Sequence, residues 1–183
     1  GSDPLRIKAP PADPGFSRTV TAGEFNGALP RRAADPSGGF SLVGSAGVLR
    51  FDDDGDGKAW KGPFCLELEP AYVAETATLV SGDVSPYCWT VFVLDDVRTE
   101  DLRQFRDLGL SLTATDAIRV VHAGLKPDYI TALRGAGYRF TLDELIDLKW
   151  QGVSADYAVA MKQAGYDFAA KELIHLKWQG VST

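Results

Sequence analysis

The acidic sequence Asp52–Gly57 holds the residue types best suited to chemistry in this chain. The carboxylates of Asp52, Asp54 and Asp56 reproduce the opening of a D-x-D-x-D-G calcium loop. Calcium takes about six to eight hard oxygen ligands, and alternating carboxylates on a tight turn supply several of them. The rest of the pattern is missing, because Pro63 stands where the bidentate Glu belongs. Two interpretations stay open: a calcium site, or an acidic hairpin loop that is simply solvated.

No other group of residues favours catalysis. The chain has no Gly-x-Ser-x-Gly, no phosphate-binding Gly-Lys-Ser/Thr loop and no dinucleotide-binding glycine pattern. The two histidines, His122 and His175, stand alone. Acidic pairs such as Asp143-Glu144 are typical of a helix first turn, where negative charge is favourable. The sequence therefore predicts a non-enzymatic protein, and a degenerate small-substrate hydrolase is the last-ranked alternative.

Charge and hydropathy exclude two classes of partner. The chain of 183 residues carries 19 Lys and Arg against 25 Asp and Glu, a net charge of −6. Nucleic-acid binding needs a basic surface, so we expect no nucleic-acid partner. No apolar run approaches the roughly 20 residues that span a bilayer, so we expect no membrane insertion by this fragment.

The heptapeptide LKWQGVS occurs at 148–154 and again at 176–182, 28 positions apart. Extending the alignment backwards gives three units of 28 residues, at 97–124, 125–152 and 153–180. Each unit has a glycine at its thirteenth and at its last position, with apolar residues spaced for two short helices between them. Glycine just past a helix adopts the left-handed conformation without steric cost. The sequence therefore predicts tandem helical hairpins.

Residues suited to helix starts support these hairpins. Thr113-x-x-Asp116 and Thr141-x-x-Glu144 are capping-box patterns, whereas Ala169-x-x-Glu172 keeps only half of one. Pro127 is suited to a first helical position and Ser154 to an N-cap.

Residues before the repeats have a different pattern. Residues 1–18 form a proline-rich flexible lead-in whose Gly1-Ser2 is typical of a cloning remnant. Residues 19–96 indicate a β-rich domain, and residues 97–183 the repeat array, with the boundary near Asp95-Asp96. The expected fold class is α+β, a small β-rich domain followed by a short α-solenoid. Strands are expected at Phe40–Val43, Gly47–Phe51, Phe64–Glu69, Thr76–Val80 and Tyr87–Leu94.

Trp150 and Trp178 occupy the same place in successive units, near the end of the second helix, where the first unit has His122. If this place faces the next unit, each Trp packs between repeats, which is the commoner outcome. If it faces solvent, the two Trp together with Tyr129 and Tyr157 form a stripe that binds a protein or peptide.

The chain closes on Val181-Ser182-Thr183, which matches Val153-Ser154-Ala155 at the start of the third unit. Either the array is truncated here, or an apolar end is left for a partner or for self-association.

The 28-residue unit resembles the helical repeats in the extracytoplasmic part of BlaR1-like membrane metallopeptidases and related anti-sigma-type bacterial sensor proteins. The shared features are three, and each occurs twice: Asp-Tyr at 128–129 and 156–157, Ala-Gly-Tyr at 136–138 and 164–166, Glu-Leu-Ile at 144–146 and 172–174. The resemblance covers residues 97–180 and implies an interaction or sensor module, periplasmic or otherwise extracytoplasmic, excised from a membrane-anchored regulatory protein. It implies no protease activity, because the zinc motif His-Glu-x-x-His of that family is absent.

The extracytoplasmic location implied by this resemblance favours a disulfide between Cys65 and Cys88, which would stabilise the fold by roughly 3 kcal/mol. As free thiols the two residues would instead be small core residues. Two cysteines without neighbouring histidines are too few for a zinc site. No cofactor is expected, unless the acidic loop binds calcium.

Overall fold

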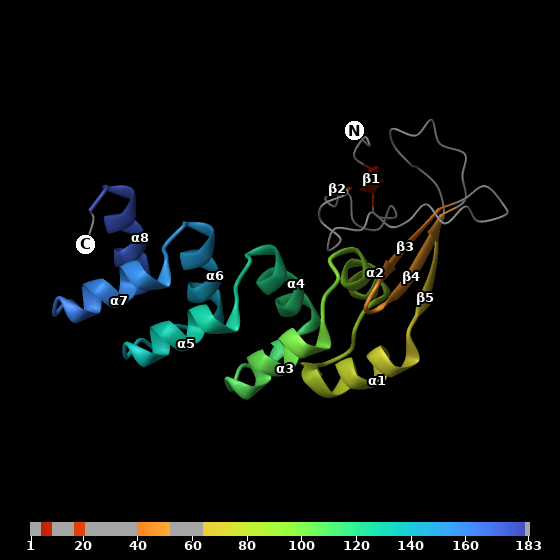
Figure 1. The fold of residues 1–183 in the computed structure, drawn as a ribbon, viewed down its shortest axis with the longest axis horizontal. Helices are drawn as coiled ribbons and strands as arrows, with labels where there is room; N and C mark the ends of the chain where they lie inside the picture. Colours follow the sequence, from red (N-terminus) through yellow and green to blue (C-terminus); the bar gives the residue numbers. More distant parts are fainter. Residues whose placement is uncertain (1–4, 9–16, 21–39, 52–63, 182–183) are drawn as a thin grey trace. The chain divides into compact units, whose positions relative to one another are not determined.

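The structure is a computed structural model that describes residues 5–8, 17–20, 40–51 and 64–181. The protein is α+β, with eight helices and seven short strands in these residues (Figure 1). It divides into two compact units. Gly1–Glu75 and Ser85–Arg98 form the first unit, and Thr76–Val84 and Thr99–Thr183 form the second.

The first unit contains a three-stranded antiparallel sheet in the order β3-β4-β5. Its strands are β3 (Phe40–Gly44), β4 (Gly47–Phe51) and β5 (Phe64–Leu68), which confirms the first three expected strands. Leu42 lies opposite Leu49, and both side chains are fully buried. Strands β1 (Leu5–Lys8) and β2 (Ser17–Val20) form a separate antiparallel pair, where the sequence had indicated a flexible lead-in.

Two of the expected strands are wrong. Thr76–Val80 lies largely in helix α1 (Pro70–Leu79), and Tyr87–Leu94 lies in helix α2 (Pro86–Leu94). Helix α2 starts with a proline, and the Ser85 side chain accepts a hydrogen bond from the Cys88 N–H at 3.2 Å. A short run that is apolar on every side has no period, so the pattern does not distinguish a buried strand from a buried helix.

Helix α2 is largely apolar because one of its faces packs against the sheet of the first unit. Val91, Phe92 and Val93 are fully buried, and α2 packs against β3 and β4. A Cβ at Gly44 would lie 2.6 Å from the Val93 carbonyl oxygen, so this close approach requires glycine. On its other side the helix contributes Trp89, whose ring packs edge-on against Tyr72 and Phe92.

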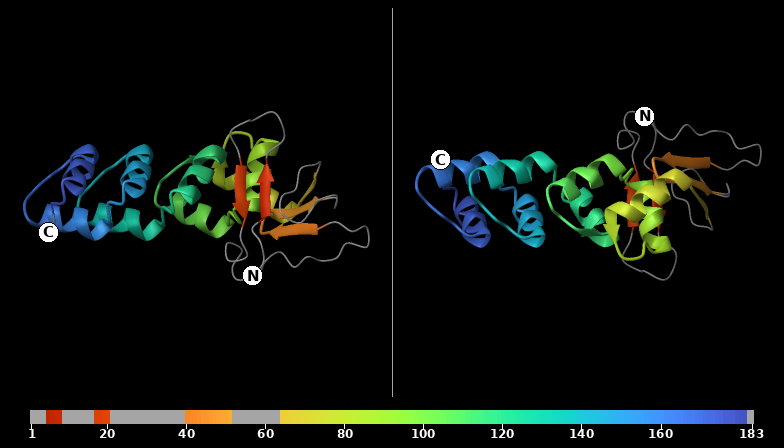
Figure 2. Two further views of the ribbon diagram at one scale, coloured as in Figure 1. Left: turned by 90° about the horizontal axis from the view of Figure 1, so that it is seen from above. Right: turned by 90° about the horizontal axis from the view of Figure 1, so that it is seen from below.

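The second unit is a series of nine-residue helices. They are α3 (Thr99–Asp107), α4 (Ala114–His122), α5 (Pro127–Gly135), α6 (Leu142–Trp150), α7 (Ala155–Gln163) and α8 (Ala170–Trp178). Figures 1 and 2 show α3, α5 and α7 side by side in one row and α4, α6 and α8 in another. Helix α5 contacts both α3 and α7, and α6 contacts α8. A short parallel pair, β6 (Val80–Ser81) with β7 (Leu112–Thr113), completes the unit.

The expected helix ends are confirmed. Thr113 and Thr141 each accept from the N–H three residues later, and the acidic residue at that position accepts in return, in capping boxes. Ser154 accepts from the Tyr157 N–H at 3.1 Å, whereas Ala169 has only the returning bond, from its N–H to the Glu172 carboxylate at 2.8 Å. All six glycines of the two columns have φ between +62° and +98°, the left-handed conformation.

Asp116 shows what such a cap does to a carboxyl group. Burial alone would raise the pKa of Asp116. Hydrogen bonds from Thr113 and from the Arg119 guanidinium lower it by more, so the pKa lies below its usual value. The Arg119 guanidinium also pairs with Asp143 at 2.6 Å, which ties the last turn of α4 to the first turn of α6 at the surface.

Candidate binding surface

The expected calcium ligands Asp52, Asp54 and Asp56 lie outside the described residues. Among the residues that are described, no group of three or more His, Cys, Asp or Glu is placed to hold a metal ion. Glu67 on β5 pairs with Arg50 at 3.0 Å, and the hydrogen bond from that guanidinium lowers the pKa of the carboxyl group. The calcium site stays a prediction.

The expected disulfide is not formed. Cys65 and Cys88 are both free; Cys65 is exposed on β5, and Cys88 is buried on α2. The expectation placed both residues in strands, but Cys88 belongs to a helix whose buried face packs on the sheet. Cys88 is therefore the small core residue of the alternative interpretation.

The aromatic stripe that the repeats suggested divides into two environments. Trp150 and Trp178 are exposed, so the expectation that they pack between units is wrong. Tyr129 and Tyr157 are buried, so they do not share a surface with the two Trp. Each Trp is the last residue of its helix, and its side chain lies past the packed faces. The preceding Lys instead turns inward, with the Nζ of Lys149 5.2 Å from the Tyr129 ring centroid.

Helix α7 covers the α5–α6 pair through one tyrosine from the turn between α5 and α6. The Tyr138 hydroxyl donates to the Ala158 carbonyl oxygen at 3.2 Å, and the Nζ of Lys162 lies 4.8 Å from the Tyr138 ring centroid. The ring of Phe140 stacks on Tyr138 at 4.8 Å. Burial, and after it the negative charge of Asp167, raise the pKa of Tyr138.

A second tyrosine fixes the start of α7. The Tyr129 hydroxyl donates to the Val153 carbonyl oxygen at 3.0 Å, and burial raises the pKa of Tyr129 to about 12. Together, Tyr129 and Tyr138 hold the α7–α8 pair on the α5–α6 pair.

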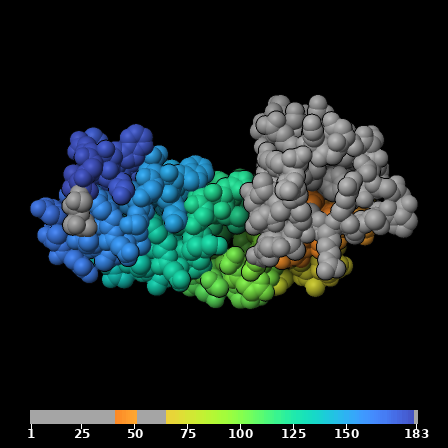
Figure 3. Space-filling view, turned by 45° about the horizontal axis from the view of Figure 1, so that its top comes forward, coloured from red at the N-terminus to blue at the C-terminus, as the bar shows by residue number. Residues whose placement is uncertain are grey.

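The corresponding surface of the last pair is open. We call it the end face; it surrounds a cavity of about 590 Å³ and is formed by Ala160, Met161, Ala164, Tyr166, Phe168, Leu176 and Val181. The rings of Tyr166 and Phe168 stack at 5.3 Å and 9°, like the Tyr138–Phe140 pair 28 positions earlier. Figure 3 shows these blue helices, α7 and α8, at the end of the row.

Residues 28 positions apart differ in solvent exposure between the end face and the covered α5–α6 surface. Tyr166 is 55% exposed, whereas Tyr138 is 4% exposed. Val181 is 39% exposed, whereas Val153 is 1% exposed. Leu176 is half-buried, whereas its counterpart Leu148 is fully buried.

The hydroxyl of Tyr157 differs from that of Tyr129 in the same way. It is buried and has no hydrogen-bond partner in the described part of the chain, whereas Tyr129 donates to Val153. A buried hydroxyl without a partner is costly, so this end of the unit is incompletely satisfied.

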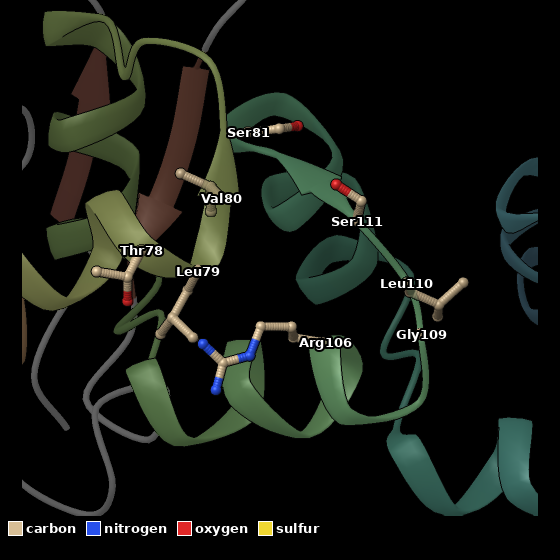
Figure 4. Close-up of a pocket in the computed structure, with 8 residues that line it drawn as sticks. All are labelled: Thr78, Leu79, Val80, Ser81, Arg106, Gly109, Leu110 and Ser111. Atoms are coloured by element: carbon tan, nitrogen blue, oxygen red, sulfur yellow. The ribbon is translucent and has the colours of Figure 1, made fainter.

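A smaller cavity of about 340 Å³ lies elsewhere in the second unit (Figure 4). The Arg106 side chain extends from α3 toward Leu79, and Ser81 and Ser111 lie near the neighbouring strands β6 and β7. Arg106 is the one charged side chain of this lining and already lies 3.8 Å from Asp107. A single paired arginine does not define an anion site, so this cavity is the weaker candidate.

From the sequence, Val181–Thr183 allowed either a truncated array or an apolar end left for a partner, and Tyr166 and Phe168 were not identified as surface residues. The signal was present in the repeated Ala-Gly-Tyr, because the structure buries the first copy, Tyr138, and exposes the second.

The chain matches no protein-family model, no curated protein and no solved structure. Across the described ranges, no helix has both the length and the apolar character needed to cross a membrane.

Proposed function

We propose that this protein is a non-enzymatic protein- or peptide-interaction module, built from tandem copies of one 28-residue helical hairpin. The observation that carries the proposal is the end face, an open apolar cavity lined by the exposed ring of Tyr166 and the half-buried ring of Phe168. Solvent-exposed aromatic residues around an apolar cavity are typical of surfaces that bind partners.

The spacing of the helices supports the repeat. Helices α3, α5 and α7 begin at Thr99, Pro127 and Ala155, and the second helix of each pair follows the same interval. The backbone bond that closes each second helix also recurs, from Leu125 N–H to Val120 at 3.0 Å and from Val153 N–H to Leu148 at 2.9 Å.

Helix α2 of the first unit follows the same interval, so we include α1–α2 as a further and divergent copy. Its N-cap Ser85 precedes Thr113 by 28 positions, and Asp96, with φ of +46°, precedes Gly124 by 28. The Tyr72 hydroxyl donates to the Val97 carbonyl oxygen at 2.7 Å, a bond like that from Tyr129 to Val153, although Tyr72 is one position out of register with the 28-residue interval.

A role as the sensor part of an extracytoplasmic, membrane-anchored bacterial protein rests on the resemblance of the 28-residue unit alone. The alternative, calcium-dependent binding through Asp52, Asp54 and Asp56, is tested separately. Millimolar calcium should raise the melting temperature of the protein and leave an Asp54→Asn, Asp56→Asn variant unchanged. An unchanged melting temperature in the original protein would eliminate this alternative.

The interaction proposal is tested by displaying a peptide library to the immobilised full chain. We expect peptides that bind the chain and lose binding to a Tyr166→Ala, Phe168→Ala double variant. The control is Lys171→Ala, an exposed position of α8 outside the end face. If no peptide is enriched, or if every enriched peptide binds the double variant equally, the end face is not a binding surface.

A further inference from the structure

We propose that the partner of the end face is an amphipathic α-helix with an apolar residue followed four positions later by Lys or Arg. The proposal rests on the proposed interaction function and names the class of ligand. Its template is the way α7 covers the α5–α6 pair.

Two residues of α7, four positions apart, make the contacts that define this class. Ala158 is fully buried and offers its carbonyl oxygen to the Tyr138 hydroxyl. Lys162 places its ammonium over the same ring, at 4.8 Å from the centroid. Residues four apart lie on one face of a helix, so one face of α7 contacts both the hydroxyl group and the ring of Tyr138.

Helix α5 presents the same pair of positions to the helix before it. Ile130, 28 positions before Ala158, is fully buried. Arg134, 28 positions before Lys162, donates a hydrogen bond to the Leu108 carbonyl oxygen in the turn that follows α3. In both helices the cation reaches back to the turn of the preceding pair, so a cation at this position is a feature of the covering helix.

The end face retains the groups that such a helix would meet. The Tyr166 ring stacks on Phe168 and the residue is 55% exposed, so a cation can reach the ring, and no bond from its hydroxyl group is found among the described residues. The cavity lined by Met161, Leu176 and Val181 would receive the apolar side chains of the helix. Among the described residues, the end face is therefore the α5–α6 surface repeated, with no helix in the place that α7 takes.

Other occupants fit less well. An extended peptide gains affinity by adding to an exposed strand edge, and the end face is formed by helices and turns. A second copy of this chain could not offer its α5 or α7, because each already covers its own neighbour through this face.

The test measures fluorescence anisotropy of a labelled, helix-stabilised peptide with the α7 sequence Ser154–Gly165, titrated with the full chain. We expect saturable binding that a Lys162→Ala peptide weakens about fivefold or more, whereas a Gln163→Ala peptide binds unchanged. Tyr166→Ala in the chain should abolish binding, Tyr166→Phe should weaken it only a few-fold, and Lys171→Ala should leave it unchanged.

Equal binding of the original and Lys162→Ala peptides would overturn the proposal, as would binding no stronger than that of a scrambled peptide. Concentration-dependent dimerisation that Tyr166→Ala abolishes would also overturn it, in favour of a second copy. If the displayed library yields peptides that need Tyr166 but are not cationic helices, the helix class fails and the interaction function stands. If no peptide needs Tyr166, both fail.

Discussion

The α5–α6 and α7–α8 pairs share 15 of 28 residues between 125–152 and 153–180, but they differ in what lies against them. Tyr138 and Tyr166 follow the same Ala-Gly, and Leu148 and Leu176 belong to the same heptapeptide. Helix α7 covers the first pair, whereas no described residue covers the second in the same way. The difference in burial between these matched residues therefore reflects the presence of a neighbouring helix and not a difference between the residues themselves.

This difference indicates that one pair of helices is too small to bury its own apolar surface. A nine-residue helix cannot bury its apolar face alone, so each pair depends on the next for its core. The predictions below use matched residues of the two pairs, so that each member controls for the other.

The largest expected difference is between Leu148→Ala and Leu176→Ala. Leu148 is fully buried, so Leu148→Ala should lower the free energy of unfolding by about 2–5 kcal/mol, because the substitution leaves a cavity. Leu176 borders an open cavity, so Leu176→Ala should lower the free energy of unfolding by about 1 kcal/mol or less. Urea denaturation of both variants measures the difference. Equal losses would mean that the end face is covered in solution.

A smaller effect is expected from alkaline pH. The pKa of Tyr129 is raised to about 12 because ionisation would place a charge in a buried site. A raised pKa stabilises the fold fully below the unfolded value near 10, and this contribution is lost as pH rises from about 10 to 12. The free energy of unfolding should therefore fall over this range, by less than the Leu148→Ala loss. Tyr129→Phe should make the fall shallower, and an unchanged profile would show that Tyr129 does not titrate as a buried group.

Removing the hydroxyl group of Tyr129 or of Tyr157 should give a smaller difference in stability between the two pairs. Tyr129→Phe removes a bond to Val153 and should cost about 1 kcal/mol. Tyr157→Phe removes a buried hydroxyl that has no partner among the described residues, so it should be neutral or slightly stabilising. Thermal unfolding of the two variants provides the measurement. A cost for Tyr157→Phe as large as that for Tyr129→Phe would reveal an acceptor at the end of the chain.

The smallest effects are expected at the two exposed tryptophans. Trp150→Ala and Trp178→Ala should each change the free energy of unfolding by no more than about 0.5 kcal/mol, because neither side chain packs between helices. A loss of several kcal/mol at Trp150 would restore the packing role that the repeat pattern first suggested. Guanidinium denaturation followed by circular dichroism distinguishes the two outcomes, since it does not depend on Trp fluorescence.

Much of the helical unit could be predicted from the sequence, because its signals are local. Thr113, Thr141 and Ser154 form caps through their own neighbours, and the glycine columns adopt the left-handed φ that their spacing indicated. The identity of Tyr87–Leu94 could not be predicted in this way. Its seven apolar residues carry no clear period around Thr90, and the packing of α2 on the sheet explains why so much of the segment is apolar.

The candidate site was harder to predict because exposure depends on neighbours. Tyr138 and Tyr166 have the same preceding residues, yet one is buried and the other is open. The Trp of the repeated heptapeptide suggested a contact residue by its size, but it lies past the end of the packed helix face. Which copy of a repeated residue is free is a property of the assembled array.

The most direct test of the account is the solvent protection of Tyr138 and Tyr166 in one sample. The full chain is labelled with 3-fluorotyrosine, the ¹⁹F signals are assigned with single Tyr→Phe variants, and a soluble paramagnetic agent is added. The account predicts strong broadening of the Tyr166 signal and little broadening of the Tyr138 signal. Adding the α7 peptide should protect Tyr166 to the level of Tyr138. Equal protection of both tyrosines before the peptide is added, or a Tyr166 signal that stays unprotected at saturating peptide, would contradict the account.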